Sequence, residues 1–134
     1  MGSQQLLLIV VGVVLIGIMI AVGMSMFKDQ TASQNRDSIS NDLVHFAVQA
    51  QKYWRRPLLM GGGGHSFTGL TLSHIVKNAT NSNGQYELIP DPVGPSITSV
   101  IITGTGFNTG NDGSTPVKVQ VTVWPDSLYM ETLN

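Results

Sequence analysis

Histidines are the residues of this chain that could most readily bind a metal or move a proton. His45, His65 and His74 are far apart in the sequence, and none has a metal-ligand spacing with another histidine or with a carboxylate. The sequence also contains no Gly-x-Ser-x-Gly nucleophile motif, no phosphate-binding loop and no close pair of carboxylates. We therefore expect no catalytic residue, no metal site and no cofactor, and we do not expect an enzyme.

One polar segment has the ligand chemistry that calcium prefers. It runs Asn108-Thr109-Gly110-Asn111-Asp112-Gly113-Ser114 and places several side-chain oxygens close together. Asp112 is its single carboxylate, which is few for a calcium loop, so we expect a solvated hairpin tip.

Two further motifs lie between residues 57 and 84. The run Gly61-Gly62-Gly63-Gly64 lacks the Lys-Ser/Thr ending of a phosphate loop, so we interpret it as a very flexible surface bend or a point where subunits approach closely. The triplet Asn78-Ala79-Thr80 has the form of an N-glycosylation sequon, although such triplets also arise by chance.

The elements that position these residues begin with an apolar run. Leu6 to Phe27 is 22 residues long and uncharged, and the first charged side chain is Lys28. As a helix it would be about 33 Å long, enough to cross a hydrocarbon layer of about 30 Å. No basic residue precedes it, and it is longer than the apolar part of a signal peptide. A secretory signal peptide is therefore the least favoured of three alternatives, the others being a single-span anchor and a helix that packs against copies of itself.

The pattern after Lys28 predicts that this helix continues to Arg56. One apolar stripe at helical spacing consists of Ile39, Leu43, Phe46, Ala50 and Tyr53. Pro57 ends the helix, because proline disfavours helical geometry at the residue before it. The division expected from these patterns is 1–27 as an apolar half-helix, 28–56 as an amphipathic half-helix and 57–134 as a globular head.

The head is predicted to consist of a connecting loop, 57–84, and an antiparallel meander, 85–134. Within the loop, residues 71–77 are expected to form a short helix capped by Thr71. The clearest strand has four valines alternating with other residues, which indicates one buried face: Val117, Val119, Val121 and Val123. The expected strands are 86–89, 97–103, 117–124 and 128–133, with a turn at 91–95 and a polar hairpin loop at 104–116.

These elements predict an α+β fold in which one long N-terminal helix packs on a four-stranded antiparallel sheet. Four strands with one apolar face need a cover, and the stripe on the long helix is the only long element that can supply it. The chain has no cysteine, so strand pairing rather than a disulfide must hold the C-terminal region.

The segment Gln5-Leu6-Leu7-Leu8-Ile9-Val10-Val11-Gly12-Val13-Val14 resembles the N-terminal signature of type IV pilins and their secretion-system relatives. In that family a glutamate precedes a Leu/Ile/Val run that opens a long helix. Gln5 stands at the glutamate position when Met1 is taken as the first residue, and the usual proline within the apolar helix is missing. The resemblance covers about the first 30 residues, and it implies the same helix-on-sheet architecture.

The resemblance also implies which residues meet in a filament. The family's glutamate is thought to pair with the terminal amine of a neighbouring subunit; Gln5 cannot neutralise that amine but can accept a hydrogen bond from it. The expected subunit interface consists of Met1, Ser3, Gln4, Gln5, Leu6, Leu8, Val11, Gly12, Leu15, Gly17, Met19 and Gly23. In assembled pilins part of this region can lose helical order, which we expect here between Gly12 and Gly23.

The function expected from this resemblance is that of the major structural subunit of a pilus-like filament, a homopolymer. The chain would be held in the cytoplasmic membrane before assembly, extracted by an assembly machinery and displayed as an extracellular filament on the cell surface. A minor pilin, a secretion pseudopilin and a single-span anchored binding module remain as alternatives. Nothing indicates nucleic-acid binding, since the net charge is −1 and no basic stripe carries interleaved aromatics.

Overall fold

The computed structural model describes residues 2–89, 94 and 96–134. It contains one long N-terminal helix and a four-stranded antiparallel sheet, an α+β arrangement as the sequence predicts. The helix, α1 (Gly2–Arg55), is followed by a 3₁₀ turn, η1 (Leu58–Met60), and a short helix, α2 (Leu72–Ile75). The strands are β1 (Gly84–Ile89), β2 (Val100–Thr109), β3 (Pro116–Val123) and β4 (Leu128–Thr132).

The chain divides into two compact units, and the boundary falls within α1 between Thr31 and Ala32. The first unit is helical over its described residues, 2–31, and the glycines at 12, 17 and 23 do not interrupt it. The loss of helical order expected between Gly12 and Gly23 concerns the filament, so it stays a prediction. The second unit, which we call the head, contains the rest of α1, both short helical elements and the whole sheet.

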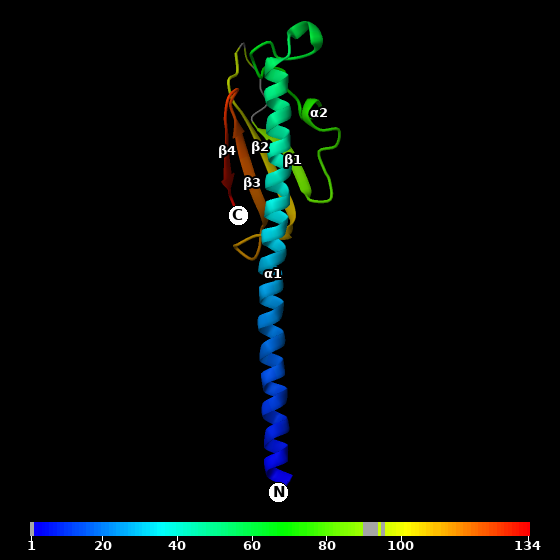
Figure 1. Cartoon of the computed structure of the whole chain (residues 1–134), viewed down its shortest axis with the longest axis vertical. Coiled ribbons are helices and arrows are strands. Elements are labelled where there is room, and N and C mark those ends of the chain that lie inside the picture. The colour runs from blue at the N-terminus through cyan, green and yellow to red at the C-terminus, as the bar shows by residue number, and fades with distance from the viewer. Residues whose placement is uncertain (1, 90–93, 95) are drawn as a thin grey trace. The chain divides into compact units, whose positions relative to one another are not determined.

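Within the head, α1 lies along one face of the sheet, whose strands follow the order β1-β2-β3-β4 (Figure 1). All neighbouring strands are antiparallel, and Val121 pairs with Ile102 on one side and with Met130 on the other. Of the expected core residues, Ile39, Leu43, Ala50 and the four β3 valines are fully buried, and Phe46 is 8% exposed. Tyr53 is only partly buried, because it lies in the last turns of α1, where its hydroxyl donates to the carbonyl of Thr68 (3.1 Å).

The second strand differs from the prediction at both ends. It begins at Val100 rather than at 97, and it continues through 104–109, which were expected to be loop. The reason is the close approach of α1: a Cβ atom on Gly104 would lie 2.5 Å from Cγ2 of Ile39. The glycines at 104 and 106 therefore make room for the helix within a strand, and the hairpin loop is confined to 110–115.

The tetraglycine bends the chain after η1, as the sequence predicts, but only its two outer residues are exposed. Gly62 and Gly63 are buried, and the amide of Gly63 donates to the carbonyl of Tyr53 (2.8 Å). Gly64 donates to the carbonyl of Arg56 (3.0 Å), the residue after α1, so the two glycines satisfy one carbonyl in the last turn of the helix and one just beyond it. Side chains at 62 and 63 would overlap the carbonyls of Arg56 and Ser66, and this close approach occurs within one chain.

Other boundaries move by a few residues. The long helix ends at Arg55, one residue before the predicted end, and Pro57 follows it. The short helix α2 is four residues long and has Thr71 at its N-cap position. The turn expected at 91–95 lies, apart from Gly94, outside the described residues.

Candidate assembly surface

The most unusual surface of this chain is the apolar segment of α1 from Leu6 to Phe27. Its large apolar side chains are all between 50% and 74% exposed, from Val10 and Val11 at the low end to Leu8 at the high end. Monomeric soluble proteins rarely expose a contiguous apolar surface of this extent. The segment is long and apolar enough to cross a membrane, with a mean hydropathy of 3.2 over its most apolar 18 residues.

Helical geometry sorts the predicted interface residues onto two sides of α1. At about 100° per residue, one side carries six of them, within roughly a third of the circumference: Leu8, Val11, Gly12, Leu15, Met19 and Gly23. Leu6 and Gly17 fall on the opposite side. Apart from the backbone of α1 itself, no described atom lies within 4 Å of the position that a Cβ would take at Gly12, Gly17 or Gly23, so another helix could approach closely at each of them.

The polar residues before the apolar run lie in the first turns of α1. Ser3, Gln4 and Gln5 are helical and exposed. Their side chains are therefore available to a neighbouring chain or to lipid headgroups. Met1, whose amine was expected to meet Gln5 of a neighbour, lies outside the described residues.

The three histidines do not form a shared site. His74 accepts a hydrogen bond at Nδ1 from the amide of Thr71 (3.1 Å) and lies against Tyr53, whereas His65 lies against Trp54. His45 is exposed on α1. Among the described residues no group of three or more His, Cys, Asp or Glu side chains could hold a metal ion.

The hairpin segment 108–114 uses its carboxylate to close its own turn. Asp112 Oδ1 accepts hydrogen bonds from the amides of Ser114 (3.0 Å) and Thr115 (2.9 Å), and Oδ2 accepts from the hydroxyl of Thr115. The Thr115 hydroxyl and these amides hold the pKa of Asp112 well below its usual range. Both oxygens of this carboxylate thus have partners within the hairpin.

Asp42 is an important polar residue that the sequence did not reveal. Its Oδ2 accepts hydrogen bonds from the side-chain amides of Asn81 and Asn83 (2.8 Å each) and from the hydroxyl of Tyr86. These donors are 39 to 44 residues away in the sequence, so no local pattern identifies them. These three hydrogen bonds hold the segment before β1, and β1 itself, against α1.

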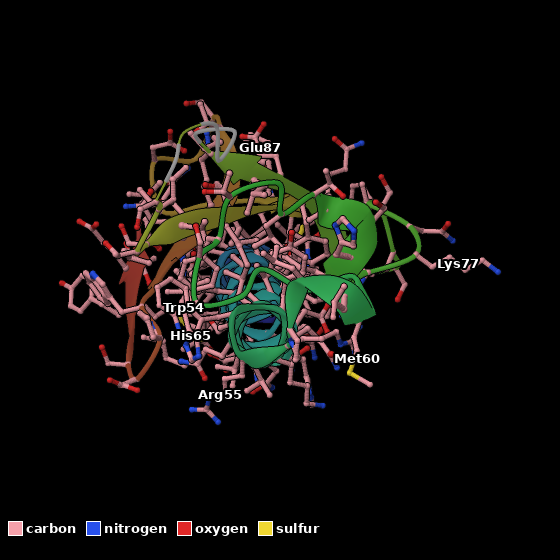
Figure 2. The ribbon with its side chains drawn as sticks, turned by 90° about the horizontal axis from the view of Figure 1, so that it is seen from above. Trp54, Arg55, Met60, His65, Lys77 and Glu87 are labelled. Carbon is pink, nitrogen blue, oxygen red and sulfur yellow. The ribbon has the colours of Figure 1, made fainter. Side chains whose placement is uncertain are left out.

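A second feature that the sequence did not reveal is an apolar tip on the head. Leu58, Leu59 and Met60 form η1 and are 74%, 101% and 73% exposed. Figure 2 shows the Met60 side chain projecting outward, away from the body of the head. The run Leu-Leu-Met directly after a helix-ending proline was the available signal.

No protein-family model matches this chain, and neither does any curated protein or any solved structure.

Proposed function

We propose that this chain is the structural subunit of a pilus-like filament and is stored in a membrane by the apolar segment of α1 before assembly. The observation that carries the proposal is the uniform exposure of the large apolar side chains from Leu6 to Phe27. Burying such a segment is worth tens of kcal/mol at roughly 25 cal/mol per Å². Either lipid or neighbouring copies of the helix can supply that burial.

Two features support assembly over simple anchoring. The first is the side of α1 that combines Leu8, Val11 and Leu15 with the open positions at Gly12 and Gly23. A lipid anchor requires only apolar character, whereas close helix packing benefits from small residues beside larger ones. The second is continuity, since α1 passes from the apolar segment into the head's core helix without a linker.

The free energy of assembly depends on the membrane in which the chain is held beforehand. In a bilayer the apolar side chains are already removed from water, so extraction gains little from the hydrophobic effect. Packing between helices, together with hydrogen bonds from Ser3, Gln4 and Gln5, must then favour the filament. We propose that a dedicated assembly machinery supplies the work of extraction, and that the filament is extracellular with the heads facing solvent.

Electron microscopy of material sheared from cells tests the proposal, with mass spectrometry of its main protein band. We expect thin fibres composed of this chain. Val11→Phe should still insert into membranes but should abolish fibres, because the larger ring prevents close packing. Val13→Phe, the same change on the opposite side of α1, is the matched control and should impair assembly less.

Wild-type cells that make the chain, yet hold all of it in detergent-soluble membranes without fibres, would contradict the proposal. That result would instead favour a single-span anchored module. Fibres built of this chain at a few copies only, within a filament of another protein, would identify a minor subunit.

A further inference from the structure

Asn78 has a polar side chain that the fold does not use. The chain has eight asparagines. Several of them hold loops in place through side-chain hydrogen bonds, namely Asn35, Asn81, Asn83, Asn111 and Asn134. Asn78 is exposed, and its side chain has no hydrogen-bond partner among the residues that the structure describes. Asn78 is also the first residue of the chain's only Asn-x-Ser/Thr triplet.

The surrounding backbone presents this triplet on the outside of the head. After α2 the chain becomes extended at Val76, and Figure 2 shows Lys77, the neighbour of Asn78, projecting away from the body of the head. The carbonyl of Ala79 accepts a hydrogen bond from the amide of Tyr86 (2.7 Å), and Thr80 pairs with Gln85. The segment is therefore fixed to β1, while the side chains of Asn78 and Thr80 remain exposed.

We propose that Asn78 is a site of N-linked glycosylation. In the reaction, Nδ2 of Asn78 attacks the anomeric carbon of an activated, phosphate-linked oligosaccharide carried by a membrane lipid. A C–N bond forms, the C–O bond to the phosphate breaks, and the lipid-linked phosphate leaves with the electron pair. The amide nitrogen loses one proton to a base of the transferring enzyme, which also reads the hydroxyl of Thr80.

The site rests on one part of the proposed function, namely that the head reaches the outer side of the membrane. It does not depend on filament formation. The glycan would add a bulky, hydrated group beside the loop before β1. The opposite edge of the sheet, at β4, would remain clear for contacts with other proteins.

Intact-mass and peptide mass spectrometry of the full chain, purified from its native cells, tests the site. We expect the wild-type peptide that contains Asn78 to carry the additional mass of one oligosaccharide. Asn78→Gln and Thr80→Ala should remove that mass, whereas Thr80→Ser should keep it because serine preserves the triplet. Since neither Asn78 nor Thr80 is buried, the melting temperature of the variants should stay close to that of the unmodified wild type.

The possible results test the glycosylation site independently of the filament proposal. Fibres of wild-type chain that carry no sugar on Asn78 would overturn the glycosylation site and leave the filament intact. A sugar that persists in Asn78→Gln would also overturn it. A glycosylated chain that forms no fibres would support the site and contradict the filament.

Discussion

At the scale of single residues, Asp42 shows how one carboxylate can organise a loop. Burial raises its pKa, but the hydrogen bonds from Asn83, Tyr86 and Asn81 outweigh that effect, and the net shift is downward. The pKa of the Tyr86 hydroxyl is raised in turn, by burial and by its hydrogen bond to Asp42. Both shifts describe the same arrangement, in which an ionised carboxylate faces a neutral phenol. Asp42 therefore stabilises the head in its charged form.

We expect Asp42→Ala to lower the free energy of unfolding by about 1–3 kcal/mol, because three donors lose their shared acceptor. Denaturant unfolding of the detergent-solubilised chain, followed by circular dichroism, measures the change. Asp37→Ala is the matched control, since Asp37 is exposed on the same helix. An equal loss in both variants would mean that charge on the helix matters and the hydrogen bonds to Asp42 do not.

The lowered pKa of Asp42 predicts that the stability of the head depends on pH. Because the folded-state pKa of Asp42 lies below its ordinary value of 3.8, its contribution is fully present above that value and is lost as pH falls through the folded-state pKa. We therefore expect wild-type stability to decline below about pH 4. Asp42→Ala should decline less over the same range. Thermal melts at a series of pH values check this, and parallel curves for the two proteins would contradict it.

At the scale of elements, the contact between α1 and β2 depends on glycine. Gly104 and Gly106 face Ile39 and Asn35, and added Cβ atoms would collide with those side chains. The strand can thus lie closer to the helix than strands with larger residues could. The shape of the head's core depends on these two positions as much as on its buried aliphatic side chains.

Gly104→Ala is expected to lower the free energy of unfolding by about 1–3 kcal/mol, because Ile39 and Tyr86 must move to admit the methyl group. Gly17→Ala is the control, because apart from the backbone of α1 itself no described atom lies within 4 Å of its added methyl group. Denaturant midpoints of the two variants and the wild type make the comparison. A denaturant midpoint for Gly104→Ala that is no lower than those of Gly17→Ala and the wild type would contradict the role of the helix–sheet contact.

The sequence predicted those elements whose signal is local. The alternating valines of β3, the apolar stripe of α1 and the stop at Pro57 each follow from spacing within one element. The roles of Gly62 and Gly63 and of the glycines at 104 and 106 could not be predicted, because neighbours outside the local sequence pattern set them. A backbone cap and a close helix–strand contact cannot be recognised until the partner's position is known.

At the scale of the whole molecule, the head has a core of its own. Every member of the buried cluster belongs to residues 32–134, and its first member is Ala32. The apolar segment of α1 contributes nothing to that cluster. The interface residues predicted before residue 31 can thus be altered without disturbing the core, which makes assembly variants interpretable.

A fragment of residues 32–134 should therefore fold without detergent. We expect a helix-and-sheet circular dichroism spectrum and a single cooperative thermal transition. The same fragment carrying Ile39→Asp should be unfolded, because a carboxylate would replace a fully buried side chain. A wild-type fragment without a cooperative transition would show that the apolar segment is needed for folding.

The packing of α1 along the sheet also has a mechanical consequence. A pull along the helix axis would act parallel to the row of contacts from Ile39 to Ala50, so these contacts would be loaded together in shear rather than peeled apart in turn. Shear spreads force over many weak contacts, and hydrogen bonds from the amides of Gly63 and His65 to the carbonyls of Tyr53 and Trp54 hold the far end of the helix. A head with no disulfide could thus resist tension through the direction of its helix alone.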